Sequence, residues 1–440
     1  MMMVAPTPSD ATRPEVPLLP SGVLRPFVLV TGLFFLWGLP NNLNDVLIRQ
    51  FMKSFAINRF QAGLVQSAFY LGYFLLAIPA GILIKQRGYK AGMLAGLVCF
   101  ALGCFLFWPA AITGSYAFFL TSLFIVASGL AFLETSANPF IAQLGPAATA
   151  ERRLNLSQAF NPFGAIGGVL IGTRFIFSGV ELTPAQIYAQ QHAGTYAAYL
   201  HQETLRVVIP YLALAAIAAI WAGLIATTRF PAYIRTDQDT GPDAPQNAAS
   251  WTTLLRNRSL RYAVLAQFLY VGAQVGTWSY FIPYAQEYAH VSERLAGLLL
   301  TGTLVAFGVG RFSSAYVMRW LSASRLMAVY ALVNVALLGI GIFAPGWAGL
   351  FAILATSFFM SIMYPTIFAI GLRGLGAQTN IAASFLVMAV LGGAVLTPLM
   401  GLIAEHSHGT AMAYLLPAVG YLVVAAFARQ AGERLETPNE

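Results

Sequence analysis

The segment TDQDTGPDAPQNAAS, from Thr236 to Ser250, separates two long apolar regions of the chain. It is rich in Asp, Pro and Gly, a composition typical of a flexible linker. The whole chain has 440 residues, of which 58% are hydrophobic and only 9% are charged. Soluble domains are about 25% charged. The composition therefore predicts a membrane protein that crosses the bilayer many times, in two parts joined by this linker.

Apolar runs on both sides of the linker indicate the number of membrane crossings. A bilayer core needs about 20 residues of apolar helix. This length predicts twelve spans: 24–50, 60–84, 91–112, 116–144, 155–178, 204–228, 259–286, 294–319, 325–344, 348–372, 379–404 and 410–430. Residues 179–203 are expected to form a long connection. Six spans before the linker and six after it predict an all-α membrane protein of two six-helix halves.

The distribution of Lys and Arg predicts the orientation of these spans. Seventeen of the 24 basic residues fall on the side of the N-terminus and six on the other side. Because cytoplasmic loops carry the excess of positive charge, both termini and the linker are expected in the cytoplasm. The expected parts are a disordered cytoplasmic tail (1–23), an N-terminal half (24–228), a cytoplasmic linker (229–258), a C-terminal half (259–430) and a short cytoplasmic tail (431–440).

Two carboxyl groups lie well inside apolar spans, those of Asp45 and Glu134. A charged side chain inside the bilayer costs several kcal/mol, so each of these residues indicates a transport pathway or a proton site. A carboxyl group that is neutral when protonated can link proton occupancy to the side on which the protein is open. The alternative is a carboxyl group held by hydrogen bonds to neighbouring helices. Residue spacing alone does not divide the roles between the two acids.

Neutral polar side chains accompany these acids at helical spacing. Asn138 follows Glu134 by one turn, Gln158 and Asn161 lie one turn apart in the fifth span, and Gln274 lies in the seventh. Each of them alone is better explained by helix packing than by ligand binding. As a set, carboxamides both donate and accept hydrogen bonds, which suits the hydroxyl groups of a neutral sugar. Basic residues are absent from the middle of most spans, which argues against an anionic substrate.

Prolines and glycines predict where the helices bend and where they touch. Several prolines interrupt the spans and each frees a backbone carbonyl, among them Pro40, Pro139, Pro162 and Pro365. The segment GAIGGVLIG places three glycines on one face of the fifth span: Gly164, Gly168 and Gly172. This pattern predicts close helix packing rather than substrate contact.

The sequence lacks the motifs of ATP-driven transport and of common hydrolases. It contains no G-x-x-x-x-G-K-[ST] loop, no G-x-S-x-G elbow and no H-E-x-x-H helix. The sequence therefore predicts neither an enzyme nor a bound cofactor. Energy for uphill transport is expected from an ion gradient, with the proton as the first candidate.

Four long motifs carry a resemblance to a known family: WGLPNNLNDVLIRQF (37–51), LETSANPFIAQLGP (133–146), RLNLSQAFNPFGAI (153–166) and SIMYPTIFAIGLRGLG (361–376). They closely resemble the fucose–galactose–glucose symporter family of the major facilitator superfamily, and the resemblance runs from about residue 24 to 430. It implies the twelve-helix major facilitator fold and alternating access. It also implies proton-linked carboxyl groups at Asp45 and Glu134.

The same resemblance implies a set of cavity-lining positions: Trp37, Asn42, Gln158, Asn161 and Tyr364. With Asn138 and Gln274 they form the expected substrate-binding set. The expected function is uptake of a neutral monosaccharide, L-fucose first, together with a proton, by a functional monomer in the bacterial inner membrane. No cofactor, metal or nucleic acid is expected. The alternatives are a galactose or glucose symporter, coupled to protons or sodium, and a non-transporting membrane sensor of sugar.

Overall fold

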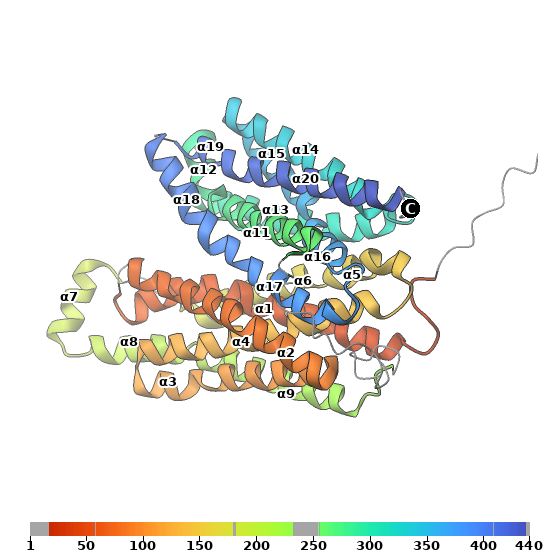
Figure 1. Ribbon diagram of the computed structural model, residues 1–440. Coiled ribbons are helices and arrows are strands. Elements are labelled where there is room, and N and C mark those ends of the chain that lie inside the picture. Colours follow the sequence, from red (N-terminus) through yellow and green to blue (C-terminus); the bar gives the residue numbers. More distant parts are fainter. Residues whose placement is uncertain are drawn as a thin grey trace, which may run out of the picture.

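The computed structural model describes residues 17–57, 59–178, 182–231, 254, 256–407 and 409–436, and these fold almost entirely into helices (Figure 1). The expected tail up to residue 16 and most of the expected linker, residues 232–253, lie outside the described residues. The helices form two groups that follow the order of the chain. The first group, red to yellow-green, occupies the lower part of Figure 1, and the second, green to blue, the upper part.

The helices of the first group are α1 (Leu24–Ser54), α2 (Arg59–Phe105), α3 (Phe107–Thr113), α4 (Tyr116–Gln143), α5 (Ala150–Gln158), α6 (Asn161–Ile171), α7 (Pro184–His192), α8 (Tyr196–Leu205) and α9 (Val208–Thr227). Those of the second are α11 (Arg258–Ser279), α12 (Phe281–Ala289), α13 (Glu293–Val317), α14 (Ala323–Phe343), α15 (Trp347–Met360), α16 (Met363–Gly371), α17 (Thr379–Met388), α18 (Gly392–His406), α19 (Thr410–Ala413) and α20 (Leu415–Glu436). Short 3-10 turns precede α5 and α17 and join α17 to α18, and a π turn follows α6.

The twelve predicted spans can be traced in these helices. Ten segments of the described chain are long and apolar enough to cross a membrane. One of them, Leu64–Thr113, contains two predicted spans, because the chain reverses at Gly88, whose φ of 84° is open to glycine at little cost. The one predicted span that is not among these ten segments is the seventh, α11 with α12, whose glutamines and arginines make it more polar than the others.

The expected long connection at 179–203 is wrong in its extent, because most of it is helical. It contains α7 and α8, and α8 leads directly into α9, so the sixth span begins at Tyr196 rather than at residue 204. Polar residues such as His201 and Glu203 lower the hydropathy of this segment, so the sequence does not predict this helix. Glu203 is nevertheless buried, because Lys53 lies 3.2 Å from its carboxylate and Gln50 donates a hydrogen bond to it at 3.1 Å.

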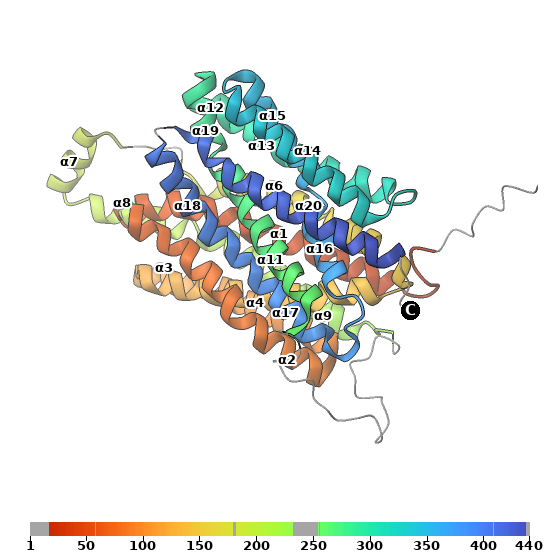
Figure 2. The ribbon, with the colours of Figure 1, turned by 45° about the horizontal axis from the view of Figure 1, so that its top comes forward.

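The packing inside one group of helices is repeated inside the other. The first span packs against the fifth (α1 on α6), and the seventh packs against the eleventh (α11 on α18). The third span packs against the sixth (α2 on α9), and the ninth against the twelfth (α14 on α20). The groups meet through α17 on α2 (Figure 2) and through α13 on α5, which are again equivalent pairs. The molecule is therefore built of two similar halves.

The glycines of the fifth span lie where the sequence predicts close packing. A Cβ added to Gly164 would come within 2.1 Å of the backbone oxygen of Phe35, and one added to Gly168 within 2.3 Å of that of Leu39. Contacts this short leave no room for a side chain. The prediction of close helix packing is confirmed, and the helix that the glycines approach is α1.

Candidate functional site

The candidate site is built around the carboxyl group of Glu134, near the middle of α4. The residue is buried, with 8% of its surface exposed. Its Oε1 accepts a hydrogen bond from the hydroxyl group of Tyr364 in α16. Because α4 belongs to the first half and α16 to the second, this bond joins the two halves at an acid that the sequence singles out.

An arginine that sequence reasoning missed lies next to this acid. Arg311 of α13 is 4% exposed; its Nε donates to the carbonyl of Ser361 at 2.8 Å, and its Nη1 donates to the carbonyl of Gln158. Pro365 and Pro162 stand four residues after these carbonyls. Proline has no N–H, so each carbonyl has lost its helical donor. Arg311 replaces both donors, one in each half of the molecule.

The charge of Arg311 also acts on the site. The guanidinium lies over the ring of Phe307, 4.6 Å from its centroid, and interacts electrostatically with the carboxyl group of Glu134. An unpaired arginine inside a membrane protein is costly, and a nearby carboxylate offsets that cost. The signal that points to Arg311 in the sequence is a single arginine within a span, read together with two prolines that free carbonyls in other spans.

A line of amides leads away from Glu134 within the first half. Gln158 donates from Nε2 to Oδ1 of Asn138 at 2.9 Å, and both residues are buried. This bond orients the Asn138 amide. The Nδ2 of Asn138 has no hydrogen-bond partner within the described part of the chain, and it faces the carboxyl group of Glu134 one turn away. Two predicted site residues are thus brought together with the acid.

Two further predicted residues meet at the crossing of α1 and α6. Asn161, the first residue of α6, donates from Nδ2 to the backbone oxygen of Phe34 at 3.1 Å. The ring of Trp37 packs against that of Phe34, with 4.3 Å between centroids, and Trp37 is 5% exposed. The chain turns between Gln158 and Asn161, so these two amides have different partners although they are one helical turn apart in sequence.

The remaining predicted residues lie on α1 and α11. Gln274 is half-buried on α11, one turn before Trp278, whose Nε1 donates to Oγ of Ser357 at 3.2 Å. Asn42 and Asp45 belong to α1, but their side chains lie outside the described part of the structure. Their roles stay predictions.

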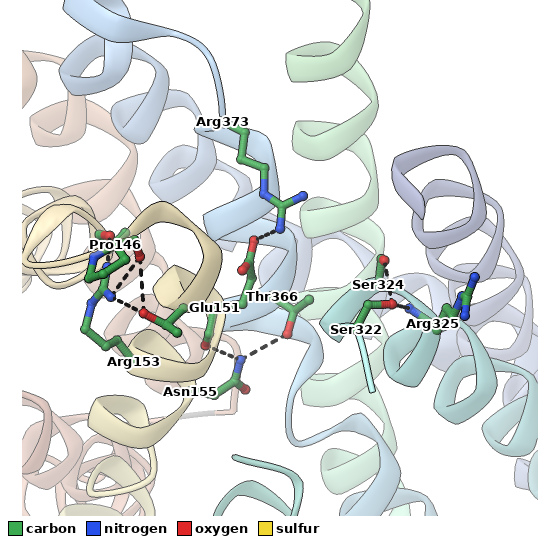
Figure 3. Close-up of polar contacts among 11 residues, drawn as sticks. Pro146, Glu151, Arg153, Asn155, Ser322, Ser324, Arg325, Thr366 and Arg373 are labelled. Carbon is green, nitrogen blue, oxygen red and sulfur yellow. Dashed lines mark hydrogen bonds and ion pairs between the residues drawn. The ribbon is translucent and has the colours of Figure 1, made fainter. Parts of the chain in front are cut away.

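A second group of contacts joins the halves at the ends of α5 and α16. Figure 3 shows Arg373, just after α16, in an ion pair with Glu151 of α5. One turn along α5, Asn155 donates from Nδ2 to Oγ1 of Thr366 at 3.1 Å. Glu151 is buried, whereas the side chain of Arg373 is 36% exposed. These four residues, called here the inter-half lock, join α5 of the first half to α16 and Arg373 of the second.

The described residues contain no group of three or more His, Cys, Asp or Glu side chains that could hold a metal ion. The candidate site is therefore one acid, one arginine, a tyrosine and several amides. Such a set can bind a proton and hydroxyl-bearing ligands.

Comparison with known proteins places the chain in a family. The model of the Major Facilitator Superfamily matches residues 29–395. The chain belongs to the major facilitator superfamily. This major facilitator protein is 46% identical over 407 residues to the L-fucose-proton symporter of Escherichia coli (strain K12), which covers 92% of each chain. It is 34% identical over 398 residues to the glucose/galactose transporter of Brucella abortus, over 90% of this chain and 91% of the relative.

A solved structure agrees with these relatives. The crystal structure of the E. coli fucose:proton symporter superposes with a TM-score of 0.84 and 45% identity, over 93% of this chain and 98% of that one. The predicted all-α fold of two six-helix halves and the predicted family are confirmed. The major facilitator protein is a multi-pass membrane transporter and not an enzyme.

Proposed function

We propose that this major facilitator protein imports L-fucose together with a proton, by alternating access, across the bacterial inner membrane. The observation that carries the proposal is the carboxyl group of Glu134, buried at the contact between the halves and bonded to Tyr364 of the opposite half. An acid in this place senses both a proton and the arrangement of the halves. The choice of sugar rests on the 46% identity to the L-fucose-proton symporter of Escherichia coli.

The proposed roles divide the site in two. Glu134 and Asp45 bind the transported proton. The ring of Trp37 packs against the sugar ring. The sugar hydroxyl groups are bound by the hydroxyl group of Tyr364 and by five amide side chains: Asn42, Asn138, Gln158, Asn161 and Gln274. Carboxamides suit this role because each offers a donor and an acceptor. The proton gradient is the energy source, and no cofactor is involved.

The orientation and assembly belong to the same proposal. Both termini and the linker at 229–258 face the cytoplasm, because the basic residues gather on that side. The two halves, 24–228 and 259–430, rock against each other within one functional monomer. The inter-half lock then lies at the cytoplasmic end, so the arrangement described here is closed toward the cytoplasm.

A second candidate substrate is galactose or glucose, taken up with protons or sodium. It is favoured by the 34% identity to the glucose/galactose transporter of Brucella abortus. The identity to the fucose symporter is higher over a similar length, so L-fucose is the first choice.

Transport by the purified protein in proteoliposomes tests the proposal. L-Fucose, D-galactose and D-glucose are offered with an imposed proton gradient, an imposed sodium gradient or neither. Accumulation of L-fucose that requires the proton gradient is expected, with alkalinisation of the outer medium when sugar is added. Accumulation driven by sodium or limited to galactose and glucose would support the second candidate. Absence of uptake for every hexose would refute both.

A further inference from the structure

We infer that protonation of Glu134 reverses the direction of its hydrogen bond with Tyr364, and that this reversal turns the Tyr364 hydroxyl group into a donor for the sugar. The inference rests on the proposed function and deepens it, because it says how one proton raises the affinity for one sugar. Donors from two helices converge on this single carboxyl group.

Two donors face Glu134 from different elements. Tyr364 of α16 donates to its Oε1, and the unpaired Nδ2 of Asn138 faces the same carboxyl group from the next turn of α4. Both donors suit a carboxylate, which only accepts hydrogen bonds. A protonated carboxyl group keeps one oxygen that accepts, while its other oxygen carries an O–H that needs an acceptor.

Only one of these donors is free to turn. Asn138 accepts a 2.9 Å hydrogen bond from Gln158 at Oδ1, which fixes the plane and direction of its amide. A hydroxyl group rotates about its C–O bond and both donates and accepts. Tyr364 therefore becomes the acceptor when Glu134 is protonated. A carboxylic acid is also a stronger acid than a phenol, so it is the better donor of the two.

The proton count follows directly. In the ionised state the Tyr364 proton lies in the bond to Glu134, and the phenol oxygen presents only lone pairs to a ligand. One proton from solvent then binds to the Glu134 oxygen and forms the reversed bond to the phenol oxygen. The Tyr364 proton, still attached to its own oxygen, turns toward the sugar. No other group gains or loses a proton.

The charged and titratable groups around Glu134 and Tyr364 are consistent with this reversal of their hydrogen bond. Among the described side chains, Arg311 from α13 and Tyr73 from α2 face Glu134. The guanidinium of Arg311 brings a positive charge near the carboxyl group of Glu134. Gln267 of α11 faces the Tyr364 hydroxyl group, but neither of its amide atoms meets the geometry of a hydrogen bond within the described chain. The hydroxyl group thus has no competing fixed partner on that side.

Binding of L-fucose to the purified full-length protein in detergent tests the inference, by calorimetry between pH 5.5 and 8.5. In the unmodified protein the Kd is expected to rise roughly tenfold from the low-pH plateau to the high-pH plateau, the loss of one donated hydrogen bond. Tyr364→Phe is expected to show the weak Kd at every pH. Glu134→Gln is expected to show the tight Kd at every pH, because its amide donates permanently to Tyr364.

Tyr270→Phe is the matched control. Tyr270 is also fully buried, its ring lies 6.5 Å from that of Tyr364, and its hydroxyl group donates to the backbone oxygen of Met360 at 3.0 Å. Tyr270→Phe removes a phenol oxygen, as Tyr364→Phe does, but this oxygen is not bonded to Glu134. The Kd of Tyr270→Phe is therefore expected to depend on pH as that of the unmodified protein does. Any contribution of Asp45 to the pH dependence of the Kd would be common to all variants. A Tyr364→Phe protein whose Kd follows pH as the unmodified protein does would overturn the inference.

Infrared spectroscopy gives a second readout that does not need sugar binding. The carbonyl stretch of protonated Glu134 is the band that disappears in Glu134→Gln. If Glu134 donates to Tyr364, this band shifts to higher frequency in Tyr364→Phe and stays in place in Tyr270→Phe. An unshifted band in Tyr364→Phe means that Tyr364 is not the acceptor, and the inference is wrong. Failure of all hexoses to bind the unmodified protein would instead refute the proposed function.

Discussion

Arg311 shows how one side chain can complete two interrupted helices. Its Nε and Nη1 take the places of the N–H groups that Pro365 and Pro162 lack, at the carbonyls of Ser361 and Gln158. Both prolines and the freed carbonyls follow from the sequence by counting four residues back. The donor that reaches them does not, because Arg311 is 153 residues away from Gln158 along the chain. The sequence predicts that these two carbonyls lack a helical donor, and only the fold shows that Arg311 is the donor that replaces it.

Replacement of Arg311 is expected to destabilise the protein. Arg311→Met fills a similar volume but leaves two buried carbonyls without a donor, and each lost bond to a charged donor is worth about 1.5–3 kcal/mol. We expect a loss of about 3 kcal/mol, measured by thermal unfolding in detergent. Arg261→Met is the control, because Arg261 is exposed at the start of α11 and a change of less than about 0.5 kcal/mol is expected there. Equal stability of the two variants would contradict this account.

The second prediction concerns the proton carried by Glu134. Glu134→Gln keeps the shape of the side chain and its bond to Tyr364 but removes the proton-binding group, so proton-driven accumulation in proteoliposomes should disappear. Counterflow exchange needs no net proton movement and is expected to continue. Glu405→Gln, at an exposed position near the end of α18, should accumulate sugar normally. Alkalinisation of the medium by Glu134→Gln on addition of sugar would show that the transported proton binds elsewhere.

At the scale of the element, the sequence predicts helices well where they are apolar and poorly where polar residues are paired. The twelve spans follow from hydropathy, and the reversal at Gly88 and the close approach at Gly164 follow from glycine. The helix α8 was missed because Glu203 looks like a loop residue. The charge of Glu203 is neutralised by Lys53 of α1, 150 positions earlier in the chain. A partner so far away cannot be predicted from the residues around Glu203.

A single methyl group tests the contact between α1 and α6. A Cβ at Gly164 would stand 2.1 Å from the backbone oxygen of Phe35, so Gly164→Ala should push the helices apart and cost about 1–3 kcal/mol of stability. Gly223→Ala is the matched control, because nothing lies within 4 Å of its added Cβ in α9. There the higher helix propensity of alanine is expected to raise stability slightly. Both are measured by thermal unfolding, and a neutral Gly164→Ala would contradict the predicted crowding.

At the scale of the whole molecule, the sequence predicts two halves but not how they meet. The count of spans, the linker and the balance of basic residues give the two-part plan. The contacts between the halves join residues more than 150 positions apart, such as Asn155 with Thr366 and Glu134 with Tyr364. Such pairs change partners as a transporter rocks, so each is a property of one arrangement rather than of the sequence alone.

The inter-half lock should therefore set the balance between arrangements. Glu151 is buried, so Arg373→Glu places two like charges together and favours the arrangement in which this end is open. The double change Glu151→Arg with Arg373→Glu restores an opposite pair.

The opening is measured by maleimide labelling of a cysteine placed at Thr366, a buried position inside the lock. The Thr366→Cys change is made in a background of Cys99→Ser and Cys104→Ser. A partly exposed pair is worth about 1 kcal/mol, so labelling about fivefold faster is expected for Arg373→Glu and near the starting rate for the exchanged pair. Arg319→Glu alters an arginine of the same half that lies over the ring of Tyr316, and its labelling rate should stay at the starting value. An exchanged pair that labels as fast as Arg373→Glu would show that these two charges do not hold the halves together.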